Sequence, residues 1–287
     1  MRRANEVAEE EASMATLVGL TSIFEGLASM RIAQIKDKVL QSTKFYHELW
    51  SIYTQIRVNQ VFSFGRDKSD KKVVDKDLII IITAEGSFNG DIDQKLIRMM
   101  LKNYDKEKQD IIVIGHHGVI QLVQARVHFD KYYKMPSRDT DINVMPLVEE
   151  IKKYKSTQVY YTEYISLMVQ DVKRIDLSRA VNEIGKSASK KEDIINEKTY
   201  IFEPSTFAVV AHLERSMMQI TVSQLILESK LAQYASRFQA MRSAHERSDE
   251  IKSGLHLEYN RAKRAVKDER LKEIVNGMKK ARQGSAG

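Results

Sequence analysis

The chain has 287 residues, 43% of them hydrophobic and 30% charged, so it can bury a core and is unlike a disordered protein. It contains no cysteine, which excludes disulfides, thiol catalysis and thiolate metal sites. The net charge of +7 arises from 46 basic and 39 acidic residues mixed along the chain, a pattern that favours a solvated or protein-covered surface over nucleic-acid binding.

Neither a membrane span nor a signal peptide is expected from the sequence. No run of about 18 uncharged apolar residues is present. The first residues, which include Glu9, Glu10 and Glu11, lack an apolar signal core. We therefore expect a cytoplasmic location.

The first segment, residues 1–60, is predicted to form one long helix. It contains no proline, and its apolar residues recur with heptad spacing. One apolar set consists of Leu17, Leu20, Phe24 and Leu27, and a second set in another register runs from Ile32 to Ile56. The change of register predicts a stutter, at which supercoiling is locally relaxed.

The middle segment, residues 61–205, is predicted to be a Rossmann-like α/β domain. The β-branched runs 78–83 and 110–115 are typical of buried parallel strands, and 91–104 between them has helical spacing. We also expect a strand at 119–123, a helix at 141–154, a hairpin formed by 157–165 and 167–175, an exposed loop at 183–198 and a closing strand at 200–202.

The last helix is predicted over residues 206–283, followed by a flexible tail at 284–287. Its apolar seam contains Leu227, Leu231, Tyr234, Phe238 and Met241, and after a polar stretch it resumes at Leu255, Tyr259, Ala262 and Val266. Gly254 predicts softer packing in the polar stretch. Each long helix must bury its seam, so we expect an antiparallel coiled coil of the two terminal helices, with the longer C-terminal helix projecting past its partner.

Three motifs could carry chemistry, and each has a structural interpretation that we favour. The loop Thr83–Asp93 could hold a phosphate, but it contains no Lys or Arg and matches no nucleotide motif, so a structural turn is expected. The Gly115–Gly118 run could offer histidine ligands, but a surface turn is expected. The tyrosine pairs 132–133 and 160–161 could stack on bases, but we expect core packing, with one tyrosine of 160–161 facing the core and the other solvent. No catalytic, cofactor or metal site is predicted.

Several short motifs occur in order along the chain. They are Leu20–Arg31, the loop Thr83–Asp93, Tyr200–Ser205 (YIFEPS), Glu228-Ser229 with Arg237, Ala240-Met241 and Ala244, Leu255–Ala262 (LHLEYNRA) and Glu273–Gly277 (EIVNG). The C-terminal motifs resemble those of the gamma subunit of F-type ATP synthases, in which E-S-x-A-S-E-H-A-A-R-M is followed by L-x-L-x-Y-N-R-A and E-I-V-x-G. The resemblance is specific at the C-terminal helix and weaker elsewhere.

The resemblance implies a non-catalytic rotor shaft. Its coiled coil would pass through a ring of alpha and beta subunits, and its α/β domain would contact the epsilon subunit and the membrane c-ring, on the cytoplasmic face of the inner membrane. No cofactor, nucleic acid or direct membrane span is implied. The residues implied to contact the catalytic ring are Arg31, Arg237, Met241, Arg261, Arg264 and Asp268. Those implied to contact the membrane ring or epsilon are Tyr200, Phe202 and Glu203.

The chain departs from the family pattern where the shaft would meet the catalytic subunits. Arg264 and Asp268 stand where the family has Gln and Thr, which predicts a contact based on charge. Arg31 replaces a lysine, keeping the charge with a different geometry. These departures leave open a rotary complex that only hydrolyses ATP. Two other classes also remain open, namely a coiled-coil scaffold or nucleic-acid-associated protein, and a nucleotide-binding enzyme built on the middle domain.

Overall fold

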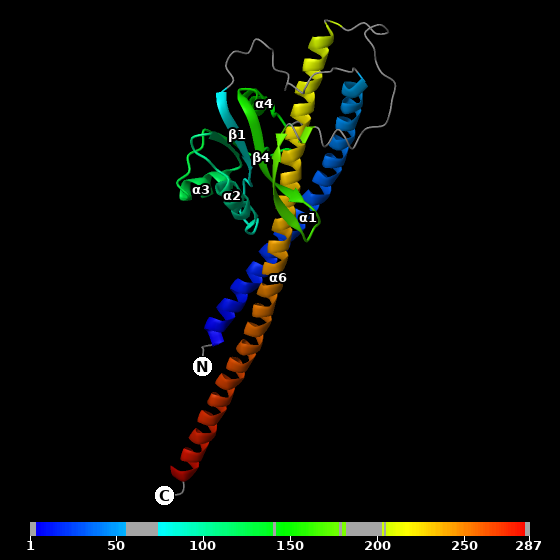
Figure 1. The fold of residues 1–287 in the computed structure, drawn as a ribbon. Coiled ribbons are helices and arrows are strands. Elements are labelled where there is room, and N and C mark those ends of the chain that lie inside the picture. Colours follow the sequence, from blue (N-terminus) through cyan, green and yellow to red (C-terminus); the bar gives the residue numbers. More distant parts are fainter. Residues whose placement is uncertain are drawn as a thin grey trace. The chain divides into compact units, whose positions relative to one another are not determined.

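The computed structural model describes residues 4–55, 74–139, 142–177, 180–181, 203 and 205–284. The chain forms two compact units, one made of Met1–Leu27 and Phe238–Gly287 and the other of Ala28–Arg237; we call them the terminal unit and the central unit. Its elements are α1 (Ala4–Gln55), β1 (Val74–Ile82), α2 (Ile92–Lys102), β2 (Gln109–Ile114), α3 (His116–Gln124), β3 (Lys131–Tyr133), α4 (Met145–Ile151), β4 (Tyr154–Tyr164), β5 (Gln170–Asp176) and α6 (Thr206–Gly284) (Figure 1).

The central unit is built on a five-stranded sheet in the order β3-β2-β1-β4-β5. Strands β1 to β4 run parallel, and β5 pairs antiparallel with β4. Helices α2 and α3 lie together on one face (Figure 1), where Ile79 and Ile81 pack against Leu96 and Leu122. The alternate residues of β1 pack on the other face with Val148 of α4 and with residues of α6. Because both faces are covered there, residues 78–82 of β1 and 111–114 of β2 are apolar at every position, as the predicted α/β fold requires.

Residues 119–123 belong to helix α3, so the prediction of a strand there was wrong. Their apolar residues also fit a helical spacing, and a helix is what a right-handed crossover between the parallel strands β2 and β3 requires. Strand β3 was missed because it is only three residues long. Helix α4 begins later than predicted, with Pro146 in its first turn. The loop predicted at 183–198 and the strand predicted at 200–202 lie outside the described residues.

The predicted hairpin is confirmed, but its tyrosine pair is not arranged as expected. Strands β4 and β5 pair antiparallel, with Tyr160 opposite Arg174. Tyr160 and Tyr161 point to opposite faces of β4, yet both are buried. Tyr160 packs in the cluster under α2 and Tyr161 in the cluster under α6. The solvent-facing tyrosine was wrongly predicted because β4 lies inside the sheet and both of its faces are covered.

In each unit, a segment of α1 pairs antiparallel with a segment of α6. In the central unit Ile35 packs against Leu227 and Leu231. Nearer the end of α1, the side-chain amide of Gln224 donates a 3.1 Å hydrogen bond to Thr43. In the terminal unit the carboxylate of Glu11 lies 2.8 Å from Nδ1 of His256. Residues 263–279 continue beyond this pair and are almost all exposed, in agreement with the predicted projection.

The seam of α6 was predicted correctly as far as Ala262, but Val266 is 44% exposed. The seam of α1 was predicted correctly from Ile32 to Tyr53 and wrongly before it. Covered residues of α1 follow one heptad register, comprising Val7, Met14, Val18, Thr21, Ala28, Ile32, Ile35, Val39, Ser42 and Tyr46. The predicted stutter is therefore absent from the described part of α1. The larger residues assigned to its first half, such as Leu17 and Leu20, are 45% and 46% exposed. We call the exposed set Leu17, Leu20, Ile23, Phe24 and Leu27 the outer stripe.

The outer stripe gives α1 an apolar character that sequence inspection underrated. One stretch of α1, Ala4–Tyr53, contains an 18-residue window with a mean hydropathy of 1.2, of which 6% is buried. By length and composition alone this helix could cross a membrane. A single such helix is weak evidence for a span, because core helices and signal sequences meet the same criterion.

Candidate functional site

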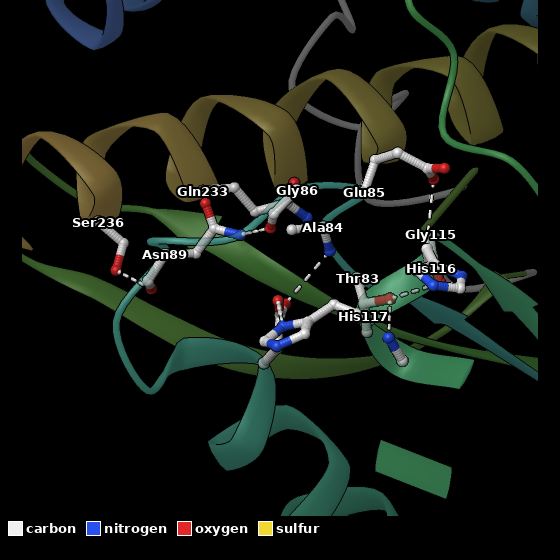
Figure 2. A network of polar contacts seen from close by, with 12 residues as sticks. Thr83, Ala84, Glu85, Gly86, Asn89, Gly115, His116, His117, Gln233 and Ser236 are labelled. Carbon is white, nitrogen blue, oxygen red and sulfur yellow. Dashed lines mark hydrogen bonds and ion pairs between the residues drawn. The ribbon is translucent and has the colours of Figure 1, made fainter. Parts of the chain in front are cut away.

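The β1–α2 loop and the start of α3 meet at the carboxyl edge of the sheet in a polar network (Figure 2). Thr83 is fully buried, and its hydroxyl lies 3.0 Å from the carbonyl oxygen of Ile114 and 2.9 Å from the Gly118 nitrogen, which donates to it. Gly115 adopts a φ of +96°, and an added Cβ would lie 2.1 Å from the Thr83 carbonyl oxygen. Only glycine allows the two chain segments to approach so closely.

Asp93 is the most buried charge of this network. Its side chain is 1% exposed and lies 2.8 Å from Nδ1 of His117. Its other oxygen accepts a 3.4 Å hydrogen bond from the Ala84 nitrogen. The hydrogen bond to Asp93 raises the pKa of His117, against the opposing effect of burial. The pair therefore holds the β1–α2 loop to α3, and the predicted surface turn at Gly115–Gly118 is in fact the anchored start of a helix.

The stability conferred by the His117–Asp93 pair is expected to depend on pH. Because the pKa of His117 is raised on folding, this stability is complete below the ordinary histidine pKa of about 6.5. It is lost as the pH rises through the raised pKa. We expect His117→Gln to remove about 1 kcal/mol of stability at pH 5.5 and less at pH 8.5, measured by urea unfolding. The exposed neighbour His116 offers the control His116→Gln, and an equal loss from both variants would contradict the assignment.

Glu85 fixes the other side of the loop. Its carboxylate accepts hydrogen bonds from the backbone nitrogens of His116, at 3.3 Å, and Met135, at 3.1 Å, and from the Tyr132 hydroxyl at 3.3 Å. The loop therefore joins β1, α3 and the segment after β3. All three acidic residues of this loop region have partners within the chain, since Asp91 pairs with Lys95 and Asp93 with His117. This is the structural turn that was predicted.

Helix α6 packs over this network and forms hydrogen bonds with it. The Ser236 hydroxyl donates a 2.7 Å hydrogen bond to the carbonyl oxygen of Asn89, whose amide donates to Gly86 (Figure 2). About two helical turns earlier, the hydroxyl of Ser229 donates a 3.4 Å hydrogen bond to the carbonyl oxygen of Ile82, at the end of β1. Lys230 is 4% exposed and binds the carboxylate of Asp139. Ser229 and Ser236 thus bind α6 to the sheet edge, and Lys230 binds it to the segment after β3.

Glu228 lies on the same helix and carries the largest carboxylate shift. Burial, with a smaller contribution from the nearby charge of Glu163, raises its pKa from 4.5 to about 7. The folded state therefore retains a proton that the unfolded state releases between these values, so stability falls as the pH rises across that range. We expect Glu228→Gln to stabilise the protein by about 1–3 kcal/mol at pH 8 and to have little effect at pH 4.5. Thermal unfolding would test this against the exposed control Glu258→Gln, and equal behaviour would refute it.

The residues predicted to contact partners fall into three groups. Arg261, Arg264 and Asp268 are exposed, and the last two lie on the projecting part of α6. Arg31 is exposed and faces Asp139 at 3.8 Å, whereas Arg237 is partly buried and Met241 is buried. Glu203 is exposed, and Tyr200 and Phe202 lie outside the described residues.

Sequence reasoning missed the pairing of Asp93 with His117, although a signal for it existed. His117 follows β2 closely, and Asp93 lies beyond the end of β1. The carboxyl ends of adjacent parallel strands meet at one edge of a sheet, so residues that follow them come together. The buried pair Lys230–Asp139 had no such signal, because it joins α6 to an irregular segment after β3.

The chain resembles known proteins along almost its whole length. A family model described as ATP synthase matches residues 4–280. The ATP synthase gamma chain of Mycoplasmoides gallisepticum is 24% identical over 91% of this chain and 93% of its own length. The gamma chain of Cytophaga hutchinsonii is 24% identical over 96% and 98%.

Solved structures share the fold. A chain in the Euglena gracilis mitochondrial ATP synthase, solved as OSCP/F1/c-ring, has a TM-score of 0.65 at 14% identity and covers 98% of this chain and 96% of its own. A chain of the central stalk/c-ring of the Tetrahymena thermophila enzyme has a TM-score of 0.58 at 14% identity and covers 78% and 99%. With the sequence match over nearly all of its length, the chain belongs to the ATP synthase family, as a member of its gamma-chain group.

Proposed function

We propose that this chain is the central-stalk rotor of an F-type ATP synthase, a subunit that transmits torque and carries out no catalysis itself. Its partners would be the alpha and beta subunits of the catalytic ring, the epsilon subunit and the membrane c-ring. It would work as a peripheral part of the complex on the cytoplasmic face of the inner membrane. Rotation would couple ATP synthesis or hydrolysis to ion transport.

The observation that carries this proposal is the outer stripe of α1. In the terminal unit α1 already buries one heptad seam against α6, yet it keeps Leu17, Leu20, Ile23 and Leu27 at 45–60% exposure. A continuous apolar stripe of this kind marks a surface for protein contact. A shaft enclosed by other subunits needs such a second face, whereas a free two-helix pair does not.

The projecting part of α6 supports the same function. Residues 263–279 extend beyond the beginning of α1, and the set Val266, Leu271, Ile274, Val275 and Met278 is 44–64% exposed. Arg264 and Asp268 lie among these residues, and both are exposed. We infer that they form charge-based contacts with the catalytic ring. Arg31, Arg237, Met241 and Arg261 remain the other predicted contacts with this ring. Tyr200, Phe202 and Glu203 remain the predicted contacts with the membrane ring and epsilon.

The division of the chain into a first helix, a central domain, a last helix and a tail remains a prediction. We infer that the two helices enter the ring of alpha and beta subunits and that the central domain stays outside this ring. The hydrogen bonds of the β1–α2 loop lie within the chain and support a structural role for this domain. The loop itself carries acidic residues and no basic ones, so it does not match a phosphate-binding loop.

Recovery of the intact complex would test the proposal directly. Native mass spectrometry of material purified with this chain as bait should show one copy with a ring of three alpha and three beta subunits, and the sample should hydrolyse ATP. A chain ending at Ala262 keeps the whole α1–α6 seam and should still assemble, but with a several-fold lower turnover. Recovery of a lone chain, or of one bound to nucleic acid, would overturn the proposal.

Point variants would then locate the contact. The double variant Arg264→Ala with Asp268→Ala should lower ATP turnover without loss of assembly. Arg270→Ala is a matched control on the same exposed extension. Equal turnover in both variants would remove Arg264 and Asp268 from the proposed contact.

A further inference from the structure

A cavity of about 200 Å³ opens at the carboxyl edge of the sheet, within the central unit. It lies between the β1–α2 loop, the segment that follows β3, and α6. Three of its lining residues are cationic, namely Lys134, Lys230 and Arg237, and one is acidic, namely Glu85. The site thus has an excess of positive charge in a concave place, which attracts anions.

Arg237 is the central group of this cavity, and among the described residues no carboxylate pairs with its charge. In the part of the chain that the structure describes, no carboxylate lies within ion-pair distance of its guanidinium, and its buried Nε has no hydrogen-bond partner. The guanidinium lies 5.1 Å from the centre of the Tyr234 ring. Burial lowers the pKa of Arg237, and this effect is opposed by Tyr234, which also hydrogen-bonds the guanidinium, and by the charge of Asp93. A buried cation is costly unless an anion or hydrogen bonds compensate it.

The carboxylates around the cavity are already engaged elsewhere. Glu85 turns towards Gly115 and His116 (Figure 2), and its carboxylate accepts hydrogen bonds from His116, Tyr132 and Met135. Asp93 binds His117, and Asp139 binds Lys230. Lys230 also donates a 2.9 Å hydrogen bond to the carbonyl oxygen of Pro136, so its own charge is compensated. The excess charge of the cavity therefore resides on Arg237 and Lys134.

The surroundings of Arg237 leave space for a small ligand. Gly86 lies beside the guanidinium, and a Cβ added there would come within 3.3 Å of its Nη2 atom. Lys134 and Ser137 line the same cavity, and both are exposed, so they are accessible from solvent. A guanidinium, an ammonium and a hydroxyl from two different parts of the chain form a donor set typical of phosphate recognition.

We propose that this cavity binds a phosphate group, held by Arg237, Lys134 and the hydroxyl of Ser137. The group is free phosphate or the terminal phosphate of a nucleotide, and the cavity encloses the phosphate rather than the base, because the ring of Tyr234 is already covered by Arg237. The site does not rest on the proposed rotor function and would exist in the chain on its own.

Isothermal titration calorimetry on the full chain tests the site. Potassium phosphate, titrated at constant ionic strength, should give saturable heat in the unaltered chain. The variant Arg237→Gln should weaken binding about 10- to 100-fold, since a charge-assisted contact is lost. Lys134→Gln, at an exposed lining residue that folding does not need, should weaken it several-fold. Arg242→Gln is the matched control, because Arg242 lies on the same helix and pairs only with Glu246 among the described residues.

Each outcome decides the proposal. Absence of saturable heat with phosphate overturns it, as does unchanged binding in Arg237→Gln and Lys134→Gln. Should Arg237→Gln fail to fold, as judged by circular dichroism, Lys134→Gln alone carries the decision. Titrations with ATP, ADP and adenosine separate the two sources: tighter binding of ATP than of phosphate identifies a nucleotide terminus, and binding of phosphate alone identifies the free anion.

Discussion

Replacing Gly115 by alanine is expected to destabilise the central unit by at least about 3 kcal/mol. The added Cβ would lie 2.1 Å from the carbonyl oxygen of Thr83 and 2.9 Å from its Oγ1, and φ at this position is +96°. The backbone cannot easily move aside, because the Gly115 nitrogen donates to Tyr133 at 3.0 Å and the Thr83 nitrogen to Ile114 at 2.8 Å. The midpoint of urea unfolding, followed by the fluorescence of Trp50, would measure the loss.

Gly254→Ala is the matched control for this prediction. Gly254 lies within α6, and a Cβ there would have no atom within 4 Å. Alanine should therefore raise stability by about 0.5–1 kcal/mol through its higher helix propensity. If Gly115→Ala were as stable as the unaltered protein, the close approach of the two loops would not exist in solution.

Asp93→Asn is expected to cost about 2–4 kcal/mol of unfolding free energy. The carboxylate is 1% exposed and is bonded to His117 and to the Ala84 nitrogen. Asparagine keeps the shape but removes the charge that faces His117 and, at longer range, Arg237. Both cationic groups would then lose the charge of Asp93. Thermal unfolding at pH 6, where the raised pKa of His117 keeps its ring charged, should show the largest difference.

The neighbouring carboxylate provides the control for this variant. The side chain of Asp91 is 66% exposed and pairs with Lys95 on the surface of α2. Such a pair contributes little, so Asp91→Asn should change stability by less than about 0.5 kcal/mol. A similar small change for Asp93→Asn would show that the buried pair does not anchor the loop.

The parts of the fold that follow from local periodicity were predictable from the sequence. The runs around Ile80 and Ile112 had to be buried strands, and the seam from Leu227 to Ala262 had to be covered by another helix. The strand predicted at 119–123 failed because a short apolar run is compatible with both helix and strand. Only the parallel pairing of β2 with β3, which requires a crossover, decides between them.

The error in α1 has a different cause. Two apolar stripes lie side by side on this helix, and the stripe with the larger residues, including Leu17 and Phe24, looks like the better seam. The structure instead covers the smaller residues Val18, Thr21 and Ala28. Small residues allow two helices to approach closely, whereas the larger ones face outwards. From a single sequence, an apolar stripe that packs within the chain cannot be distinguished from one that packs against another protein.

The candidate site could also be predicted only in part from the sequence. The loop Thr83–Asp93 and the histidines after β2 could be placed at one sheet edge from the strand pattern alone. That no carboxylate pairs with Arg237 could not be predicted, because this depends on which carboxylates are already bound to other groups. These carboxylates are occupied only in the folded chain, where Glu85, Asp93 and Asp139 are bonded to other residues.

The pairing of α1 with α6 also governs the order in which the protein can form. Glu11 and His256 are 245 residues apart in sequence, so α1 leaves the ribosome long before the helix that covers it exists. At about 5–20 residues per second, the wait lasts roughly ten to fifty seconds. During this time both apolar stripes of α1 are uncovered, and the nascent helix has the hydropathy of a membrane segment. Until α6 has been made, the apolar residues of α1 are therefore open to contact with other proteins.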